Sequence, residues 1–248
     1  MKLEDITAVI TGSTGNLGGA ISLALAEAGC ACICHYHTNQ KHAEELVRQI
    51  TDMGREAIAI CADLTIADQI EKLFAEAATI GPVQILVNSV SVFQKQPLGD
   101  VTFEDAQNVM DINLLGPILT CREFAQAVLS QQNPKSANPV GKIINLVDVG
   151  GIRPWANYAV YCASKAGLIA ATKSMAKELA PAICVNAIAP GVITWPEGFG
   201  KEDKERQLAH IPAGRTGYTS EITSAIIFLL ENDYITGQIL NIDGGRCI

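Results

Sequence analysis

The sequence carries little positive charge and few aromatic residues. Lysine and arginine together number 18 against 26 aspartate and glutamate residues, so the formal net charge is -8, and aromatic residues make up 5% of the 248 positions. An excess of negative charge opposes binding to nucleic acid and to anionic lipid surfaces, which both attract basic proteins. The composition therefore predicts a small-molecule substrate, with neither nucleic acid nor a membrane as a partner.

Long apolar runs are also missing. No stretch is long enough to cross a bilayer, and the segment from Met1 to Asp5 turns acidic where an export signal is basic and then apolar. We therefore expect a cytoplasmic protein. With 48% hydrophobic and 18% charged residues, the chain has the composition of a globular protein with a large core.

The eight cysteines include no Cys-x-x-Cys pair. Cys30, Cys32 and Cys34 alternate along an expected strand, so their side chains point to one face of it. A metal site there would need further ligands in tetrahedral geometry. We interpret the three as small buried hydrophobes in a reducing compartment, and the sequence predicts no metal site.

Short apolar segments rich in β-branched residues alternate with longer segments of helical spacing. Strands are expected at 6–11, 30–36, 57–61, 85–88, 142–147, 184–188 and 238–242, and helices at 17–28, 41–53, 67–78, 103–129, 158–179 and 220–230. This order predicts an α/β fold, a Rossmann-like doubly wound parallel sheet of about seven strands, in a single domain over residues 1–248. Loops are expected at 131–138 and 194–204, the second either a lid over the substrate or an ordinary surface loop.

The first expected strand ends in a glycine-rich turn, Thr11 to Gly18, that runs into a helix. Small residues there let the backbone approach a pyrophosphate, and the helix amino terminus offers free N–H groups and the positive end of its dipole. Position after the first strand favours a dinucleotide site over a merely structural turn.

The second expected strand ends without the acidic residue that usually contacts an unphosphorylated ribose. Its polar residues, His35, His37, Thr38 and Asn39, are able to donate hydrogen bonds to a 2′-phosphate, which favours NADP(H) over NAD(H). The alternative is that Thr38 or Asn39 caps the next helix. Asp63, after the third strand, either accepts from an adenine amine or forms a cap beside Thr65.

Tyr161 and Lys165 are the sharpest feature of the sequence. Four positions separate them at the start of an expected helix, so both side chains lie on one face. A lysine ammonium near a phenol favours the phenolate and lowers the pKa of the tyrosine. Such a pair suits proton donation to a carbonyl oxygen while a hydride reaches the carbon.

Taken together and in order, several motifs resemble the short-chain dehydrogenase/reductase family over essentially the whole chain. The matching pieces are Thr11-Gly12 with Gly18, Asp63-Leu64, Asn88, Asn113, Tyr161 with Lys165, Pro190-Gly191 and Asp243-Gly244-Gly245. The resemblance implies that Tyr161 is the catalytic acid/base, that Lys165 binds the nicotinamide ribose and tunes Tyr161, and that Asn113 supports a water-linked proton relay. The cofactor-binding residues are then expected to be Gly12, Thr14, Asn16, Leu17, Gly18, His37, Thr38, Asn39, Asp63, Leu64, Asn88, Ser89, Lys165, Pro190, Gly191 and Ile193.

Three departures from the family are similar to those of its pteridine reductase branch. Asp148 stands where the family has serine, Asn16 replaces the middle glycine of the first turn, and Asn88 is followed by Ser89-Val90-Ser91-Val92-Phe93. The branch also has aspartate at the serine position, a phenylalanine that stacks on the pterin, and a His-Tyr-His run as at 35–37. It has arginines where this chain has Asn16 and Thr38. By this resemblance, the substrate contacts are Ser91, Phe93, Asp148, Tyr161 and Trp195.

Asp148 also has a physical logic of its own. An ionised carboxylate beside Tyr161 opposes the phenolate and raises the pKa of the tyrosine. A protonated or proton-sharing Asp148 is instead able to donate to a ring nitrogen of a heterocycle, and a pair of groups with separated pKa values is a common acid/base arrangement. The alternative is that Asp148 only caps the following loop.

The sequence thus predicts an NAD(P)H-dependent oxidoreductase that reduces a pterin-like or small carbonyl substrate, with Tyr161, Lys165, Asn113 and Asp148 as its catalytic residues. Alternatives within the family are a 3-oxoacyl-carrier-protein reductase and an alcohol or sugar dehydrogenase. A further alternative is a nucleotide-sensing homologue without turnover. A homotetramer or homodimer is expected, with helices 103–129 and 158–179 at the main interface.

Overall fold

The computed structural model describes residues 1–130, 139–195, 198 and 200–248. Its strands are β1 (Thr7–Thr11), β2 (Ala31–Tyr36), β3 (Ala57–Cys61), β4 (Val83–Asn88), β5 (Gly141–Leu146), β6 (Ile183–Pro190) and β7 (Ile239–Ile242). Its α-helices are α1 (Asn16–Glu27), α2 (Gln40–Asp52), α3 (Ala67–Ala77), α4 (Phe103–Met110), α5 (Gly116–Ser130), α6 (Ala159–Leu179), α7 (Lys201–Leu208) and α8 (Thr219–Glu231). The loop expected at 131–138 and part of the one expected at 194–204 lie outside the described residues.

The seven strands form one parallel sheet in the order β3-β2-β1-β4-β5-β6-β7. The chain builds outward from β1 to β3, then crosses back and continues from β4 to β7 on the other side. Carboxyl ends of parallel strands meet at one edge, and the reversal between β1 and β4 opens a crevice there in which ligands bind. The Rossmann-like, single-domain fold predicted from the alternation is confirmed.

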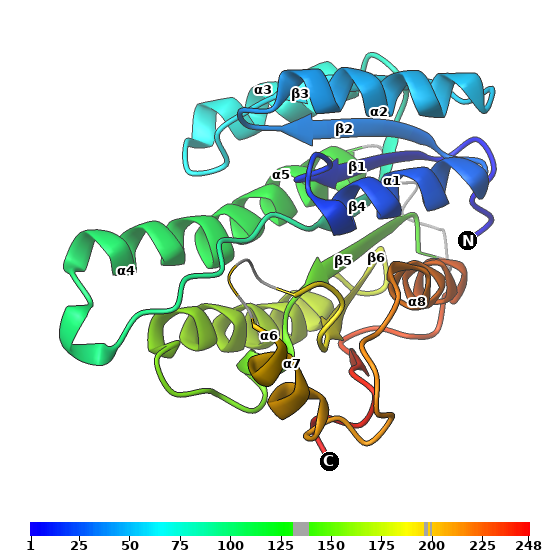
Figure 1. Ribbon diagram of the computed structural model, residues 1–248. Helices are drawn as coiled ribbons and strands as arrows, with labels where there is room; N and C mark the ends of the chain where they lie inside the picture. The colour runs from blue at the N-terminus through cyan, green and yellow to red at the C-terminus, as the bar shows by residue number, and fades with distance from the viewer. Residues whose placement is uncertain (131–138, 196–197, 199) are drawn as a thin grey trace.

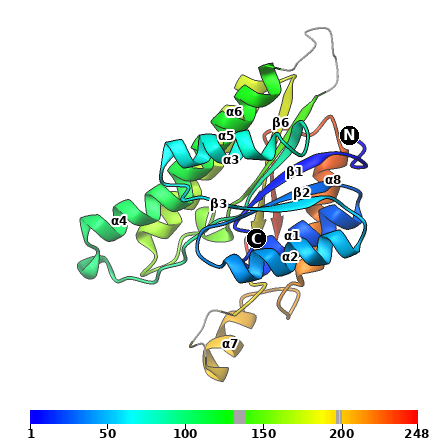
Figure 2. The same ribbon diagram turned by 90° about the horizontal axis from the view of Figure 1, so that it is seen from above.

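Helices cover both faces of the sheet (Figure 1). The view from above separates α1, α2 and α8 on one face from α3, α5 and α6 on the other, with α7 projecting away from the layers (Figure 2). When helices cover both faces of a sheet, neither set of alternating side chains on a strand faces water, and nearly all residues of the strand are apolar. In β6, for example, all eight residues are buried.

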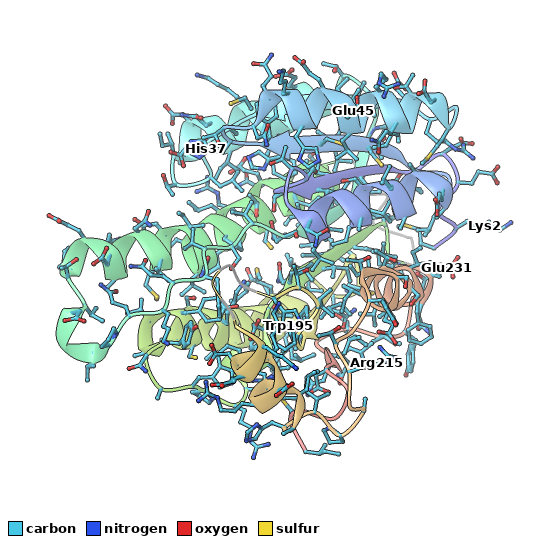
Figure 3. All side chains as sticks on the ribbon, viewed as in Figure 1. Lys2, His37, Glu45, Trp195, Arg215 and Glu231 are labelled. Atoms are coloured by element: carbon cyan, nitrogen blue, oxygen red, sulfur yellow. The ribbon has the colours of Figure 1, made fainter. Side chains whose placement is uncertain are left out.

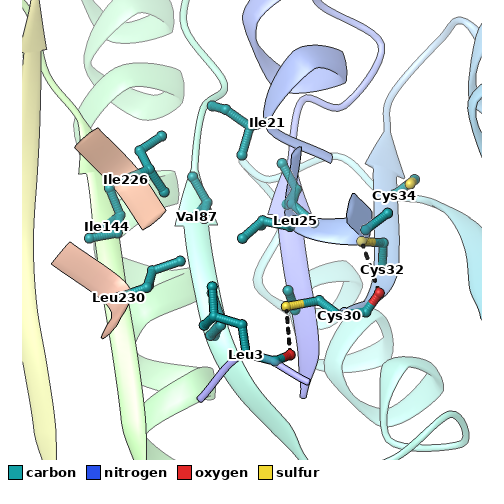
Figure 4. Packing of buried hydrophobic residues seen from close by; sticks show 14 of the residues in the cluster. Leu3, Ile21, Leu25, Cys30, Cys32, Cys34, Val87, Ile144, Ile226 and Leu230 are labelled. Carbon is teal, nitrogen blue, oxygen red and sulfur yellow. Dashed lines mark hydrogen bonds between the residues drawn. The ribbon is translucent and has the colours of Figure 1, made fainter. Parts of the chain in front are cut away.

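The three cysteines of the second strand lie in the core between the sheet and the helices α1 and α8 (Figure 4). Leu25 and Ile226 belong to the same core cluster. Burial raises the pKa of the Cys30 and Cys34 thiols to about 12, so both stay protonated at neutral pH. The cysteines therefore pack as small hydrophobic side chains, as the sequence predicts.

The long helix expected at 103–129 is divided in two. The helices α4 and α5 are joined by a wider π-helical turn over Asp111–Leu115. Pro117 has no N–H, so it cannot donate the hydrogen bond to the Asn113 carbonyl that a regular α-helix would make. A second difference is that Lys201–Leu208, at the end of the expected 194–204 loop and beyond, is the helix α7. Within the described residues, no helix is both long and apolar enough to cross a membrane.

Candidate active site

The turn between β1 and α1 brings two glycines into contact. Gly12 has a φ of 68°, and a Cβ atom at Gly18 would lie 2.2 Å from the Gly12 carbonyl oxygen, so only glycine fits there. Among the described residues, no side chain caps the start of α1, which leaves its first N–H groups to a ligand. Thr14, Asn16 and Leu17 share this turn, so the cradle fits the diphosphate of a dinucleotide.

A buried histidine holds the turn in place. The Gly12 N–H donates to Nδ1 of His35 at 3.0 Å, and Nε2 of His35 lies 2.9 Å from the carbonyl oxygen of Ala62. Because Nδ1 accepts, Nε2 carries the proton and donates to Ala62. Burial lowers the pKa of His35 to about 4, so the ring is neutral. The expectation that His35 contacts a 2′-phosphate was wrong, because both of its nitrogens are engaged inside the protein.

The residues after β2 divide between two roles. His37 and Thr38 are exposed at the carboxyl end of the strand; Figure 3 marks His37 at this end of the sheet. The Asn39 carboxamide accepts from the His42 N–H at 3.2 Å and so caps α2. Its assignment to the cofactor gives way to the helix-cap alternative, whereas His37 and Thr38 remain open to solvent.

Asp63 stands across from these residues at the end of β3. Its Oδ1 accepts from both the N–H and the hydroxyl of Thr65, at 2.9 and 2.7 Å, and its Oδ2 lies 3.9 Å from Nε2 of His37. The backbone hydrogen bond from Thr65 leads the interactions that hold the pKa of Asp63 below its ordinary value. One oxygen therefore fixes the turn, and the other faces the end of β2. The neighbouring Leu64 is buried in the core, so its side chain is not a cofactor contact.

Asn88, at the end of β4, is a buried structural link. Its Nδ2 donates to Oδ1 of Asn145 at 2.9 Å, and its Oδ1 accepts from the Thr120 hydroxyl at 2.7 Å. The assignment of this side chain to the cofactor was wrong, since it ties β4 to β5 and α5 inside the core. The next residue, Ser89, donates its N–H to the Thr11 hydroxyl at 3.0 Å and so joins the ends of β4 and β1.

Asn113, in the π-helical turn, clamps the segment after β4. Its Oδ1 accepts from the Val92 N–H at 2.8 Å, and its Nδ2 donates to the Val92 carbonyl at 2.9 Å and to the Ser164 hydroxyl at 3.2 Å. The Asn113 side chain is fully buried. This pair of bonds fixes the backbone between Ser91 and Phe93 at the edge of the site.

Tyr161 and Lys165 lie on one face of α6, as their spacing predicts. The Lys165 ammonium is 6.0 Å from the centre of the Tyr161 ring and donates to the Leu146 carbonyl at 3.0 Å, at the end of β5. Burial lowers the pKa of Lys165 to about 8, and the Asp148 charge opposes this shift. The carbonyl group at the end of β5 thus holds the Lys165 ammonium beside Tyr161.

Asp148 reaches the same tyrosine from the loop after β5. Its Oδ1 accepts from the Gly150 N–H at 2.6 Å, and its carboxyl group interacts with the Tyr161 hydroxyl closely enough to influence the pKa of that tyrosine. Burial raises the pKa of Asp148 above its ordinary value. Burial also raises the pKa of Tyr161, and the Asp148 charge raises it further. The expected lowering of the Tyr161 pKa by Lys165 was therefore wrong for this environment, and the opposing effect of Asp148 prevails.

Three aromatic rings, those of Phe93, Trp155 and Tyr158, pack around the Tyr161 ring. The Phe93 ring stands edge-on to Tyr161, with centroids 4.8 Å apart at 88°, and stacks on Tyr158 at 4.9 Å and 24°. The Trp155 ring is nearly parallel to Tyr161, with centroids 6.5 Å apart at 15°. Phe93 keeps 44% of its surface exposed. The site thus offers flat apolar walls next to one proton donor.

The loop after β6 closes the opposite side of the cleft. A Cβ at Gly191, which follows Pro190, would lie 2.8 Å from the Asp243 Cα, so glycine is required there. Nδ2 of Asn16 donates to the Thr194 hydroxyl at 2.9 Å. This bond joins the first residue of α1 to the segment that carries Ile193 and Trp195. Figure 3 shows Trp195 in that segment, between β6 and α7.

Arg246 is a further residue near Trp155, and no motif in the sequence predicts its place there. Its guanidinium carbon lies 5.5 Å from the centre of the Trp155 ring, and its Nη2 donates to Oε1 of Gln207 on α7 at 2.6 Å. Arg153, which the sequence analysis did not assign, donates to the carbonyls of Arg246 and Ile248. Arg246 lies 85 positions after Tyr161, and only the adjacent Asp243-Gly244-Gly245 motif hints that it lies near the site.

Known proteins match the chain along nearly all of its length. A family model described as enoyl-(acyl carrier protein) reductase matches residues 12–246. A 3-oxoacyl-[acyl-carrier-protein] reductase from Synechocystis is 35% identical over 96% of this chain and 95% of its own length. The 3beta-hydroxysteroid dehydrogenase 1 of Eggerthella lenta is 35% identical over 99% and 95%.

Solved structures agree with the sequence comparison. The crystal structure of a blue fluorescent protein from a metagenomic library, in complex with NADPH, superposes with a TM-score of 0.89 at 29% identity and covers 100% of both chains. The tyrosine and the lysine that carried the resemblance lie on one face of α6, and the glycine-rich turn joins β1 to α1. The chain belongs to the short-chain dehydrogenase/reductase family and is an NAD(P)-dependent oxidoreductase.

Proposed function

We propose that this enzyme uses NADP(H) to reduce a flat, pterin-like heterocycle. The observation that carries the proposal is the pairing of Asp148 with Tyr161, where the family has serine thirteen residues before the tyrosine. A serine hydroxyl donates to a carbonyl oxygen without adding charge. Burial raises the pKa of the Asp148 carboxyl group, so it holds its proton more readily than an exposed aspartate and is suited to donate to a ring nitrogen.

The residues divide the work of a reduction between them. A bound nicotinamide cofactor supplies the hydride. The half-exposed Phe93 ring, which stands edge-on to Tyr161, offers an aromatic contact to a flat substrate ring. Tyr161 donates its hydroxyl proton to the atom that gains negative charge, and Asp148, beside it, shares that proton or protonates a second ring atom. Lys165 positions the ribose and keeps a cation below the tyrosine.

Preference for the phosphorylated cofactor is supported by the end of β2. His37 and Thr38 are exposed there, and no carboxylate stands on that strand end to repel a 2′-phosphate. Asp63 is the nearest acidic group, but one of its oxygens is engaged by Thr65 and the other lies beside His37. A protonated His37 would reduce the repulsion between Asp63 and the phosphate.

A second candidate is the reduction of a 3-oxoacyl thioester. It is favoured by the 35% identity with a 3-oxoacyl-[acyl-carrier-protein] reductase over nearly the whole chain. The two candidates make different demands on the site, because an acyl chain needs an open channel whereas a pterin needs an exposed aromatic face and a proton donor for nitrogen.

One assay separates the candidates. Oxidation of NADPH is followed at saturating cofactor with a dihydropterin, a quinonoid dihydropterin, acetoacetyl thioester and a simple ketone. We expect kcat/KM to be highest for one of the pterins. A higher kcat/KM for the thioester would replace the proposal by the second candidate, and no oxidation with any of the four would support the nucleotide-sensing alternative.

We further propose that the enzyme forms a homotetramer or homodimer through α4, α5 and α6. Phe103 leaves 82% of its surface exposed, and Leu115 46%, both on the segment expected at the interface. Gly167, on α6, packs inside the subunit, since a Cβ there would lie 3.0 Å from the Leu114 side chain. Light scattering at micromolar concentration tests the assembly, and a monomer mass would contradict it. The cytoplasmic location stays a prediction.

A further inference from the structure

Arg246 has a buried hydrogen-bonding group without a partner. Among the described residues, its Nη1 is the buried side-chain nitrogen or oxygen for which no hydrogen bond is formed. A guanidinium nitrogen of this kind carries two N–H donors and a share of the positive charge. Leaving it buried and unpaired is unfavourable, so such a group marks a place where a ligand oxygen improves the site.

The position of Arg246 relates this donor to the reaction centre. The guanidinium packs against the Trp155 ring at 5.5 Å, and the Trp155 ring in turn lies nearly parallel to Tyr161 at 6.5 Å. The Arg246 charge also contributes to the pKa of Asp148, which places the two groups in one electrostatic environment. Arg246 therefore stands one aromatic ring away from the proton donor.

The backbone around Arg246 is held from several sides. Nη1 of Arg153 donates to the carbonyls of Arg246 and Ile248, at 3.1 and 3.2 Å. The Asp243 carboxylate accepts from the N–H groups of Gly245 and Cys247, both at 2.9 Å. Only the tip of the Arg246 side chain is left to adjust, through its bond to Gln207 on α7. The charge is thus placed in advance of ligand binding, which lowers the entropic cost of using it.

Two cations converge at this point of an otherwise acidic protein. Arg153 and Arg246 both act on the Cys247 thiol, lowering its pKa against the larger effect of burial. The acidic groups around them are Asp148, which accepts from the Gly150 N–H, and Asp243, which accepts from backbone N–H groups. These carboxylates are engaged by the backbone, and the Arg246 side chain donates to the neutral Gln207, so its charge is left to an anionic group of the substrate.

We infer that Arg246 binds a carboxylate carried by the substrate, beyond the Trp155 ring from the reacting atoms. The inference rests on the proposed function only in placing the reacting ring beside Tyr161. A planar carboxylate matches the fork of a guanidinium and accepts from Nη1. Because Nη1 has almost no contact with solvent, the carboxylate must displace a neighbouring side chain to reach it. We expect that side chain to be Gln207, which accepts a hydrogen bond from Nη2 of the same guanidinium.

Binding of two matched probes tests the inference without requiring turnover. Benzoate and benzamide have the same shape and differ in charge, and each is titrated calorimetrically into the enzyme saturated with NADPH. We expect benzoate to bind the wild type about tenfold to hundredfold more tightly, the range of a charge-assisted hydrogen bond. Arg246→Gln should make the two affinities equal, and Arg246→Lys should keep part of the difference. Arg48→Gln, an exposed ion-paired arginine on α2, is the matched control and should change nothing.

Equal affinities in the wild type would overturn the inference, as would an unchanged ratio in Arg246→Gln. Should Arg246→Gln fail to fold, the wild-type ratio and the Arg246→Lys ratio decide. Turnover is compared separately, with pterin-6-carboxylate and 6-methylpterin. Carboxylate binding through Arg246 without turnover of either pterin would refute the proposed function and leave this site standing. Turnover of both pterins with no preference for benzoate would support the proposed function and refute the carboxylate site at Arg246.

Discussion

The Asp148 carboxyl group and the Tyr161 hydroxyl influence each other's ionisation in the candidate active site. Burial raises the pKa of both groups, and the charge of the aspartate raises that of the tyrosine further. An ionised Asp148 therefore opposes loss of the Tyr161 proton and keeps the tyrosine in its proton-donating form.

Replacement of Tyr161 by phenylalanine removes the transferable proton and preserves the ring. We expect kcat to fall by about 10²–10⁴-fold, the usual contribution of a general acid. The affinity for NADPH, measured by fluorescence titration, should stay within about twofold. Tyr158→Phe is the matched control, because Tyr158 stacks on the same Phe93 ring. Activity in Tyr161→Phe near the wild-type level would remove Tyr161 from the catalytic role.

The pH dependence of the reduction should report Lys165. Burial lowers the pKa of this lysine from 10.5 to about 8, so its positive charge is lost as the pH rises through about 8. We expect kcat/KM to fall on that side, and Lys165→Met to abolish this limb while lowering the whole profile. The lowered pKa also predicts that the folded state gains stability between pH 8 and 10.5, since the unfolded chain still binds the proton there. If kcat/KM of Lys165→Met still falls at the same pH, the fall is caused by another titratable group.

Asp148→Ser restores the residue that the family usually has. We expect kcat/KM for a pterin to fall by at least about tenfold and that for a simple ketone to stay equal or rise, because a serine donates to a carbonyl oxygen without negative charge. The same change should lower the pKa of Tyr161, visible as an earlier tyrosinate absorbance in a spectrophotometric titration. An unchanged ratio of the two substrates would mean that Asp148 does not determine specificity.

Cofactor choice should depend on the exposed end of β2. We expect NADPH to bind more tightly than NADH, and Thr38→Asp to weaken NADPH binding about tenfold by placing a carboxylate beside the 2′-phosphate. Thr51→Asp adds the same charge at an exposed position near the end of α2 and should leave the preference unchanged. Tighter binding of NADH by the wild type would refute the preference.

Asn88 should matter for folding more than for chemistry. Asn88→Ala removes the N–H donor of the Asn145 Oδ1, whereas the Thr120 hydroxyl keeps the Pro117 carbonyl as an acceptor. We expect the free energy of unfolding to fall by about 1–3 kcal/mol for the buried Asn145 oxygen that loses this donor, measured by urea denaturation. Asn108→Ala, on the exposed side of α4, is the control. A weakened cofactor affinity without loss of stability would return Asn88 to the cofactor site.

The fold was predictable because each strand is a short apolar run between two helical segments. A sheet covered on both faces imposes that pattern on its sequence, and it survives in segments as brief as Ala57–Cys61. The break at Asn113 was missed although Gly116-Pro117 signals it, because the apolar spacing continues on both sides of the turn. The helix α7 was missed because its composition, rich in Lys and Glu, suits an exposed helix as well as a loop.

The site was predictable where a motif fixes a side chain, as for Tyr161 and Lys165. It was not predictable where burial decides the role. His35 and Asn88 have the residue types of ligand-binding groups, and only the surrounding backbone shows that their polar atoms are already bonded inside the protein. Arg246 illustrates the opposite case, since no local pattern indicates that a residue so late in the chain meets Trp155.

The clamp between Asn113 and Val92 has a consequence for how this enzyme could change its substrate. Two hydrogen bonds from one buried amide fix the backbone at Val92, while the side chains on either side of it, Ser91 and Phe93, stay exposed toward the cleft. Substitution at these two positions alters the shape and polarity of the pocket without disturbing the main chain that presents them. Divergence to a new substrate is therefore expected to begin at Ser91 and Phe93, with Asn113 kept as their common support.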